Sequence, residues 1–84
     1  MYLVIRIIDE DCIMEKDLRL FDNKQKAIDY KEFLAECSIS LIEEYYGDDI
    51  KNLDHVDILN TEKLFEINDT TFIITIEIIE LQVF

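Results

Sequence analysis

A β-hairpin is predicted most clearly by residues 63–84, which read KLFEINDTTFIITIEIIELQVF. Two runs rich in β-branched and aromatic residues are separated by the turn-favouring triplet Asn-Asp-Thr. Four apolar side chains line one face of the second strand: Phe72, Ile74, Ile76 and Ile78. At Ile79 the apolar phase shifts by one position, which predicts a β-bulge or the emergence of this strand at a sheet edge.

A second hairpin is predicted at the N-terminus. Residues 2–8 are apolar and β-branched, and the acidic segment that follows them ends this strand. Residues 18–21 are expected to pair back on it. The apolar side chains fall on both faces of the first strand, with Leu3, Ile5 and Ile7 on one and Val4 and Ile8 on the other. A strand that is apolar on both faces is typical of the middle of a sheet.

Between the hairpins, residues 24–46 predict one long helix. Asp22 is the expected N-cap, because Gln25 follows it three residues later in the manner of a capping box. Gly47 occupies the position of a left-handed C-terminal cap. The segment CSIS, residues 37–40, is where a kink or break is expected. The residues expected to form the buried stripe of the helix are Ala27, Tyr30, Leu34, Cys37, Leu41 and Tyr45.

A second apolar sector lies beside this stripe on the predicted helix. Two interpretations of it are open. Another part of the chain covers the sector, or the sector is an exposed patch for a homodimer or a protein partner. Its residues are Ile28, Ala35, Ile39, Ile42 and Tyr46.

The order of the elements predicts a single compact α+β domain that spans residues 1–84. A small antiparallel sheet of three or four strands, in the order β-β-α-(α)-β-β, would pack against the one long helix. The bracketed element is a short helix within residues 49–56, for which Asp48 or Asp49 could act as the cap.

Charge is distributed unevenly along the chain. Twenty acidic residues against eight basic ones give a net charge of −12 at pH 7. Residues 1–42 contribute −3 and residues 43–84 contribute −9. A field of this sign repels nucleic acid and anionic membranes and attracts basic surfaces. A high net charge also keeps small proteins dispersed, so solubility alone is a second explanation.

We expect a soluble, cytoplasmic protein. No apolar run reaches the roughly 18 residues that a membrane-spanning helix requires, and the N-terminal run lacks the features of a secretory signal. Cys12 and Cys37 do not form a C-x-x-C pair. They are expected to remain reduced thiols.

The sequence shows no motif of an enzyme. His55 has acidic neighbours and could act as a general base, but Ser38 and Ser40 lie in the predicted helix without a nucleophile motif. The acids of residues 48–57 miss the spacing of a calcium loop, and zinc ligands are too few. One glycine cannot form a phosphate-binding loop, and the acidic balance opposes nucleic-acid binding. We therefore expect no catalysis, no cofactor, no metal site and no membrane partner.

Acidic side chains form a row along the predicted helix. Asp29, Glu32, Glu36 and Glu43 fall within an arc of about 60° when the helix is laid out at 3.6 residues per turn. Only Lys26 lies near this edge, so the ion pairs common on solvated helices are scarce. Carboxylates pair with guanidinium groups, and tyrosine provides a stacking face for arginine. The candidate residues for binding a basic protein surface are Asp29, Glu32, Glu36, Glu43, Glu44, Tyr46, Asp48, Asp49, Asp54 and Asp57.

In size, acidity and α+β organisation the chain resembles small phage-encoded anti-defence proteins, above all the anti-CRISPR inhibitors. The segment LFDNKQKAIDYKEFL, residues 20–34, is similar to small phage and mobile-element proteins in which a strand leads into a capped helix. The resemblance implies an acidic inhibitor that acts in the cytoplasm of the bacterial host cell. There it would block a basic, nucleic-acid-binding surface of a bacterial defence nuclease, such as a CRISPR effector. The alternative is a self-associating structural or regulatory interaction module without nucleic-acid mimicry.

Overall fold

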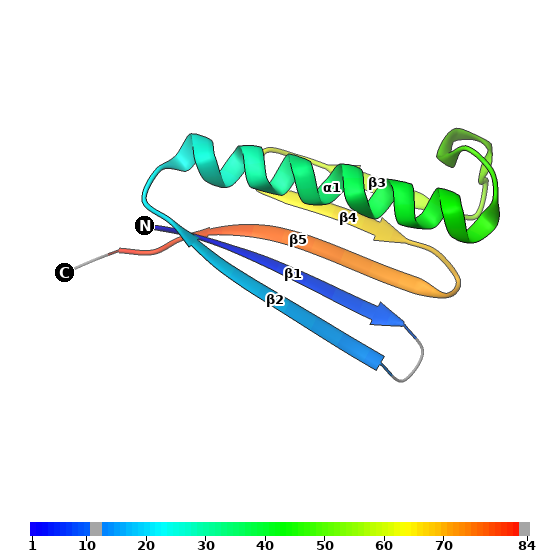
Figure 1. Ribbon diagram of the computed structural model, residues 1–84, viewed down its shortest axis with the longest axis horizontal. Coiled ribbons are helices and arrows are strands. Elements are labelled where there is room, and N and C mark those ends of the chain that lie inside the picture. Colours follow the sequence, from blue (N-terminus) through cyan, green and yellow to red (C-terminus); the bar gives the residue numbers. More distant parts are fainter. Residues whose placement is uncertain (11–12, 83–84) are drawn as a thin grey trace.

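The protein is a five-stranded antiparallel sheet with one long helix packed on one face. The computed structural model describes residues 1–10 and 13–82. The strands lie in the order β2-β1-β5-β4-β3, and α1 packs closest to β5 and β1 (Figure 1). The α+β prediction is confirmed, although the sheet has five strands. The elements are β1 (Tyr2–Glu10), β2 (Ile13–Phe21), α1 (Lys24–Tyr46), the single 3₁₀ turn η1 (Ile50–Asn52), β3 (Asp57–Asn60), β4 (Leu64–Asn68) and β5 (Phe72–Glu80).

The two predicted hairpins are joined by the pairing of β1 with β5. This antiparallel register runs unbroken from Tyr2 opposite Glu80 to Glu10 opposite Phe72. It places β1 between β2 and β5, as expected for a strand that is apolar on both faces. The register contains no bulge at Ile79, so that alternative is wrong. The other alternative is confirmed for the end of the strand, because β4 pairs with β5 only as far as Leu64 opposite Glu77, and Ile79 pairs with β1 alone. Ile79 lies on the face of the sheet that is turned away from α1, opposite Leu3.

The core lies between α1 and the sheet. The alternation predicted for β5 is confirmed, because Phe72, Ile74, Ile76 and Ile78 are all buried. Full burial of each such side chain contributes about 1.5–3 kcal/mol to folding. The remaining core residues are Val4, Phe65 and Ile67 from the sheet and Ala27, Leu34, Ala35 and Ile42 from α1.

The buried face of α1 is rotated from the predicted stripe. Cys37, Leu41 and Tyr45 are exposed. The second apolar sector, from Ile28 to Tyr46, is covered by the rest of the chain instead, which excludes it as an exposed patch. The buried face contains two polar residues, Lys31 and Ser38. The apolar pattern of the sequence therefore does not identify it as the core face. Both polar residues are satisfied by hydrogen bonds, so their burial costs little.

The two ends of α1 are fixed by different caps. The N-cap is Asn23 and not Asp22, because the Asn23 Oδ1 accepts hydrogen bonds from the amides of Gln25 and Lys26 at 2.8 and 3.2 Å. Gly47 ends the helix in the left-handed conformation, with φ of 69°, as predicted. Between the caps α1 is continuous through the CSIS segment, where the Ser38 hydroxyl donates to the Leu34 carbonyl and leaves the helix intact.

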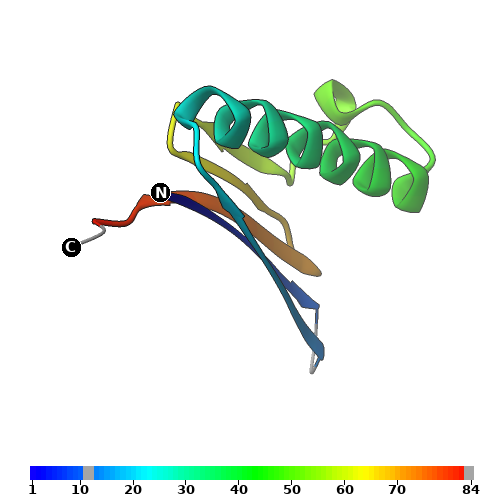
Figure 2. The same cartoon turned by 60° about the vertical axis from the view of Figure 1, so that its left-hand side comes forward.

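Two short elements differ from the predictions. The helix expected within residues 49–56 is only the turn η1, with Asp49 as an N-cap whose side chain makes no capping bond. β3 was not anticipated, because its four residues are all exposed and lack an alternating pattern. β2 also begins five residues earlier than expected, since pairing with β1 keeps its polar first half extended. Figure 2 shows that α1 covers one side of the sheet and that the other side is open among the described residues.

Candidate protein-interaction surface

The predicted acidic row lies along the solvent side of α1. Asp29, Glu36 and Glu44 are exposed, and Asp29 accepts a hydrogen bond from the Gln25 side-chain amide at 2.9 Å. Glu32 is also exposed, but its Oε1 accepts from the Lys31 ammonium at 2.8 Å. Glu36 and Glu44 therefore have no hydrogen-bond partner among the described residues, whereas Asp29 has a neutral donor and Glu32 is paired with a lysine.

Glu43 joins this row to the segment after the helix. Its Oε2 accepts a hydrogen bond from the Ile50 amide at 2.9 Å, and its carbonyl accepts from the amides of Gly47 and Asp48. Glu43 is half-buried and has a structural role in starting η1. The acids of the helix and those of the following turn are consequently continuous in space.

Asp48 and Asp49 form the turn at the end of the row. The Asn52 side-chain amide and the Asp49 backbone amide both donate to Asp48 Oδ1, at 3.1 and 2.8 Å. These two hydrogen bonds, the one from Asn52 first, hold the pKa of Asp48 below its ordinary value of 3.8. The carboxylate of Asp48 is therefore charged over the whole physiological range.

Tyr46 belongs to an aromatic cluster that anchors the end of α1. Its hydroxyl donates to Asp69 Oδ2 at 3.2 Å, and its half-buried ring packs edge-on against Tyr45 and His55 at 4.9 and 4.8 Å between centroids. The exposed ring of Tyr45 also packs edge-on against Phe72. Tyr46 thus holds the fold together, and Tyr45 is the tyrosine that faces solvent.

Asp54 and Asp57 lie apart from the helix row. Asp54 is exposed in the loop before β3. Asp57 pairs with Asn68, and the alternation around the buried Ile67 puts Asp57 on the face of the sheet opposite α1. The ten predicted residues therefore divide into a continuous acidic surface and a remainder. The acidic surface consists of Asp29, Glu32, Glu36, Glu43, Glu44, Asp48 and Asp49.

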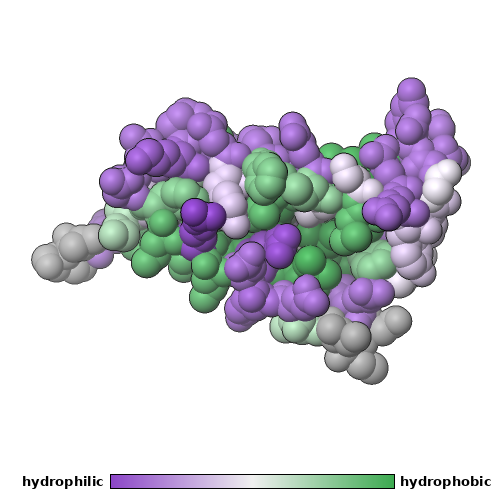
Figure 3. Space-filling view, viewed as in Figure 1, coloured by the Kyte–Doolittle hydropathy of each residue, from purple (hydrophilic) through white to green (hydrophobic). Residues whose placement is uncertain are grey.

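Exposed apolar side chains lie beside this acidic surface, and two of them, Cys37 and Leu41, were predicted to be in the core. Phe33 and Leu41 are 58% and 45% exposed, and with Cys37 they follow one side of the helix at four-residue spacing. Figure 3 shows hydrophilic residues along the top of the molecule and a hydrophobic band beneath them. A shallow groove on α1 combines both kinds of side chain, and it is lined by Phe33, Glu36, Cys37, Ser40, Leu41 and Glu44.

Few bases lie near the acidic surface. Lys31 is the only base between Asp29 and Asp49, and it is fully buried. Lys24 pairs with Glu62 at 2.8 Å, and this contact raises the pKa of Lys24 and lowers that of Glu62. The exposed bases beside the surface are Lys26 and Lys51. Two exposed lysines do not balance the seven acids, so the electrostatic field of the acidic surface stays negative.

Four further observations concern His55, metal ligands, membrane-spanning helices and the cysteines. His55 is exposed, and its described contact is the Tyr46 ring. Within residues 1–10 and 13–82, no three histidine, cysteine or acidic side chains converge as metal ligands would. No helix in the described part of the chain is long and apolar enough to cross a membrane. Cys37 is an exposed free thiol, and Cys12 lies outside the described residues.

Comparison of the chain with models of protein families, with curated proteins and with solved structures found no match.

Proposed function

We propose that this protein is an acidic inhibitor that binds a basic, nucleic-acid-binding surface of another protein, such as a bacterial defence nuclease. The observation that supports the proposal is the continuous acidic surface of α1 and its C-terminal turn, within which the only base is buried. A surface of this kind attracts basic partners from solution and accelerates their association.

The groove on α1 suggests how arginine side chains would be bound. Glu36 and Glu44 provide carboxylates that accept from a guanidinium group, and the exposed ring of Phe33 lines the same groove as a stacking face. Seven residues separate Asp29 from Glu36 and Glu36 from Glu43, which is about 10 Å along the helix axis. Charges held at fixed spacing on a rigid helix bind with less loss of conformational entropy than charges on a flexible segment.

Binding to an arginine-rich peptide tests the surface directly. Titration of the ¹⁵N-labelled protein with such a peptide should shift amide resonances of residues 29–49 first, and affinity should fall as salt rises from 50 to 300 mM. The double variant Glu36→Gln/Glu44→Gln should weaken binding about tenfold, since each lost charge-assisted contact is worth up to about 1 kcal/mol at an exposed site.

The matched control is Asp9→Asn/Asp57→Asn, which removes the same charge from the opposite face of the sheet. Equal weakening by both double variants would show that net charge alone governs binding and would contradict the proposed surface. Affinity that is independent of salt would contradict the electrostatic mechanism.

Inhibition itself is tested with a guide-loaded Cas9 nuclease and a labelled target duplex. The protein should lower the fraction of nuclease that holds the duplex, and a higher concentration of the target duplex should restore it. A protein that binds Cas9 without displacing the duplex would contradict inhibition through the nucleic-acid-binding surface.

A further inference from the structure

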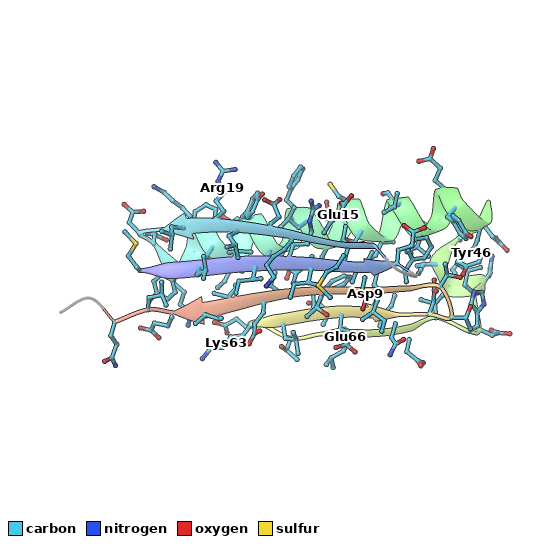
Figure 4. All side chains as sticks on the ribbon, turned by 90° about the horizontal axis from the view of Figure 1, so that it is seen from below. Asp9, Glu15, Arg19, Tyr46, Lys63 and Glu66 are labelled. Atoms are coloured by element: carbon cyan, nitrogen blue, oxygen red, sulfur yellow. The ribbon has the colours of Figure 1, made fainter. Side chains whose placement is uncertain are left out.

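The face of the sheet opposite α1 is apolar and open, and it carries an inference beyond the proposed function. Figure 4 views this outer face with α1 behind the sheet. On edge strand β2, Leu18 and Leu20 are 57% and 54% exposed. On β1, Leu3, Ile5 and Ile7 are half-buried, as is Ile79 on β5. The central side chains of the outer face are Leu3, Ile5, Ile7, Leu18, Leu20 and Ile79.

The strand registers align the residues of the outer face in rows. One row crosses the sheet from Lys16 on β2 through Ile7 and Thr75 to Glu66 on β4. The next row runs from Leu18 through Ile5 and Glu77 to Leu64. In the first row, Lys16 and Glu66 therefore lie on opposite sides of the line between β1 and β5 and at equal distances from it. Lys16 is the only base in the two rows.

We propose that this face binds the same face of a second copy of the chain, giving a two-fold symmetric dimer with its layers in the order helix, sheet, sheet, helix. The two-fold axis would run parallel to the strands, midway between the two sheets and over the line between β1 and β5. Rotation about this axis places each row of one copy over the same row of the other copy, with its two ends exchanged. Lys16 of one copy then lies opposite Glu66 of the other, twice in the dimer. Lys16 also lies diagonally opposite Glu77, whose carboxylate would otherwise be buried without a partner.

Apolar side chains also meet in the same arrangement. Leu18 lies opposite Leu64, and Leu3 lies opposite Ile79, in rows that the axis leaves level. Sheets that pack face to face are about 10 Å apart, a separation that side chains of this size fill. The Lys16–Glu66 charge pair and these apolar contacts are therefore formed by the same axis.

The area of the outer face suits a dimer. Three nine-residue strands and the five residues of β4 cover about 500 Å² at ~3.4 Å per residue and ~4.8 Å per strand. Two copies bring together about 1,000 Å², which reaches the size of a specific interface. A monomer would have to leave this apolar area in water.

Pairing of β2 edges is the competing arrangement for a second copy. Charges on an edge strand oppose the addition of another strand. Four of the five residues 15–19 of β2 are charged, namely Glu15, Lys16, Asp17 and Arg19. The outer face lies across the sheet from the acidic surface, so the dimer leaves both acidic surfaces free, and the two proposals are tested independently.

Sedimentation equilibrium of the purified chain measures the dimer directly. Leu18→Lys should weaken dimerisation by about 100-fold, because each dimer loses two apolar contacts and buries two unpaired charges. The matched control is Phe33→Lys, an equally exposed apolar residue on α1, which should leave the dimer constant within about threefold of the native value. Circular dichroism of each variant confirms that it is folded.

A charge exchange tests the axis. Lys16→Glu and Glu66→Lys should each weaken the dimer about tenfold by placing like charges opposite one another. The double variant keeps the native net charge and should recover the native dimer constant. A monomer at millimolar concentration, a dimer that survives Leu18→Lys, or a double variant without recovery would overturn the proposal.

Discussion

The side-chain ammonium of Lys31, in the middle of α1, donates a hydrogen bond of 2.7 Å to the backbone carbonyl of Thr61, thirty residues further along the chain. The same ammonium donates to Asn60 Oδ1 at 3.0 Å and to Glu32 Oε1 at 2.8 Å. All three of its hydrogens are thereby used, which is what allows a fully buried lysine in this core. Lys31 thus fixes the helix against the connection between β3 and β4.

Replacement of Lys31 by methionine should destabilise the protein by about 2–3 kcal/mol, because Asn60 and Thr61 would lose their donor. Chemical denaturation measures the free energy of unfolding. Lys26→Met is the control, since Lys26 is exposed and its Asp22 contact is 3.7 Å; it should cost less than about 0.5 kcal/mol. Equal costs for the two variants would contradict a structural role of Lys31.

The bond between Tyr46 and Asp69 should stabilise the end of α1 against the β4–β5 turn. Asp69 also accepts from the backbone amides of Thr71 and Phe72. We expect Tyr46→Phe to cost about 1 kcal/mol and Asp69→Ala at least 2 kcal/mol, since the latter leaves buried donors unpaired. Tyr45→Phe is the matched control, and a cost as large as that of Tyr46→Phe would show that the hydroxyl bond is not responsible.

The position of the N-cap is testable by two alanine substitutions. Asn23→Ala removes the acceptor of two backbone amides and should cost about 1 kcal/mol. Asp22→Ala removes only the long contact with Lys26 and should cost less than about 0.5 kcal/mol. Thermal unfolding of both variants gives the order, and the reverse order would restore Asp22 as the cap.

The Lys24–Glu62 pair should make stability depend on pH. The hydrogen bond from Lys24 lowers the pKa of Glu62 below 4.5 in the folded protein. Its contribution is therefore present above pH 4.5 and is lost as the pH falls through the lower folded value. The difference in melting temperature between the native protein and Glu62→Gln should shrink over that window.

An NMR titration of Glu62 checks the same pair without unfolding. The pKa of Glu62 should rise toward 4.5 in Lys24→Gln. At high pH, the raised pKa of Lys24 predicts that the contribution of the pair to stability is fully present below pH 10.5. This contribution is lost as the pH rises through the higher pKa of the folded protein. A Glu62 pKa that is unchanged by Lys24→Gln would show that the ion pair does not form in solution.

Several features follow from local chemistry and were predicted without the structure. Alternation in β5 identified Phe72 and Ile76 as core residues because side chains of a strand point to opposite faces at every step. Gly47 was identified as the helix end because the left-handed conformation is strained for other residues. The acids of α1 were placed together because the period of a helix is fixed.

Other features depended on which surfaces meet. The core face of α1 contains Lys31 and Ser38, and only contacts from β3–β4 and from the helix backbone make their burial acceptable. β3 forms because β4 provides a paired edge, not because its own residues favour a strand. Asp57 was predicted to belong to the acidic surface, but its pairing with Asn68 places it on the opposite face of the sheet.

The sequence by itself therefore determined the α+β class, the two hairpins, the extent of α1 and the sign of its exposed surface, because these depend on residues close in the chain. Tertiary structure alone decided the rotation of α1, the fifth strand and the apolar outer face. The apolar shift at Ile79 was visible in the sequence, but its meaning required the β1–β5 register, which places Ile79 beside Leu3 on a face that no described residue covers. Such pairings join residues more than sixty positions apart, and no local pattern encodes them.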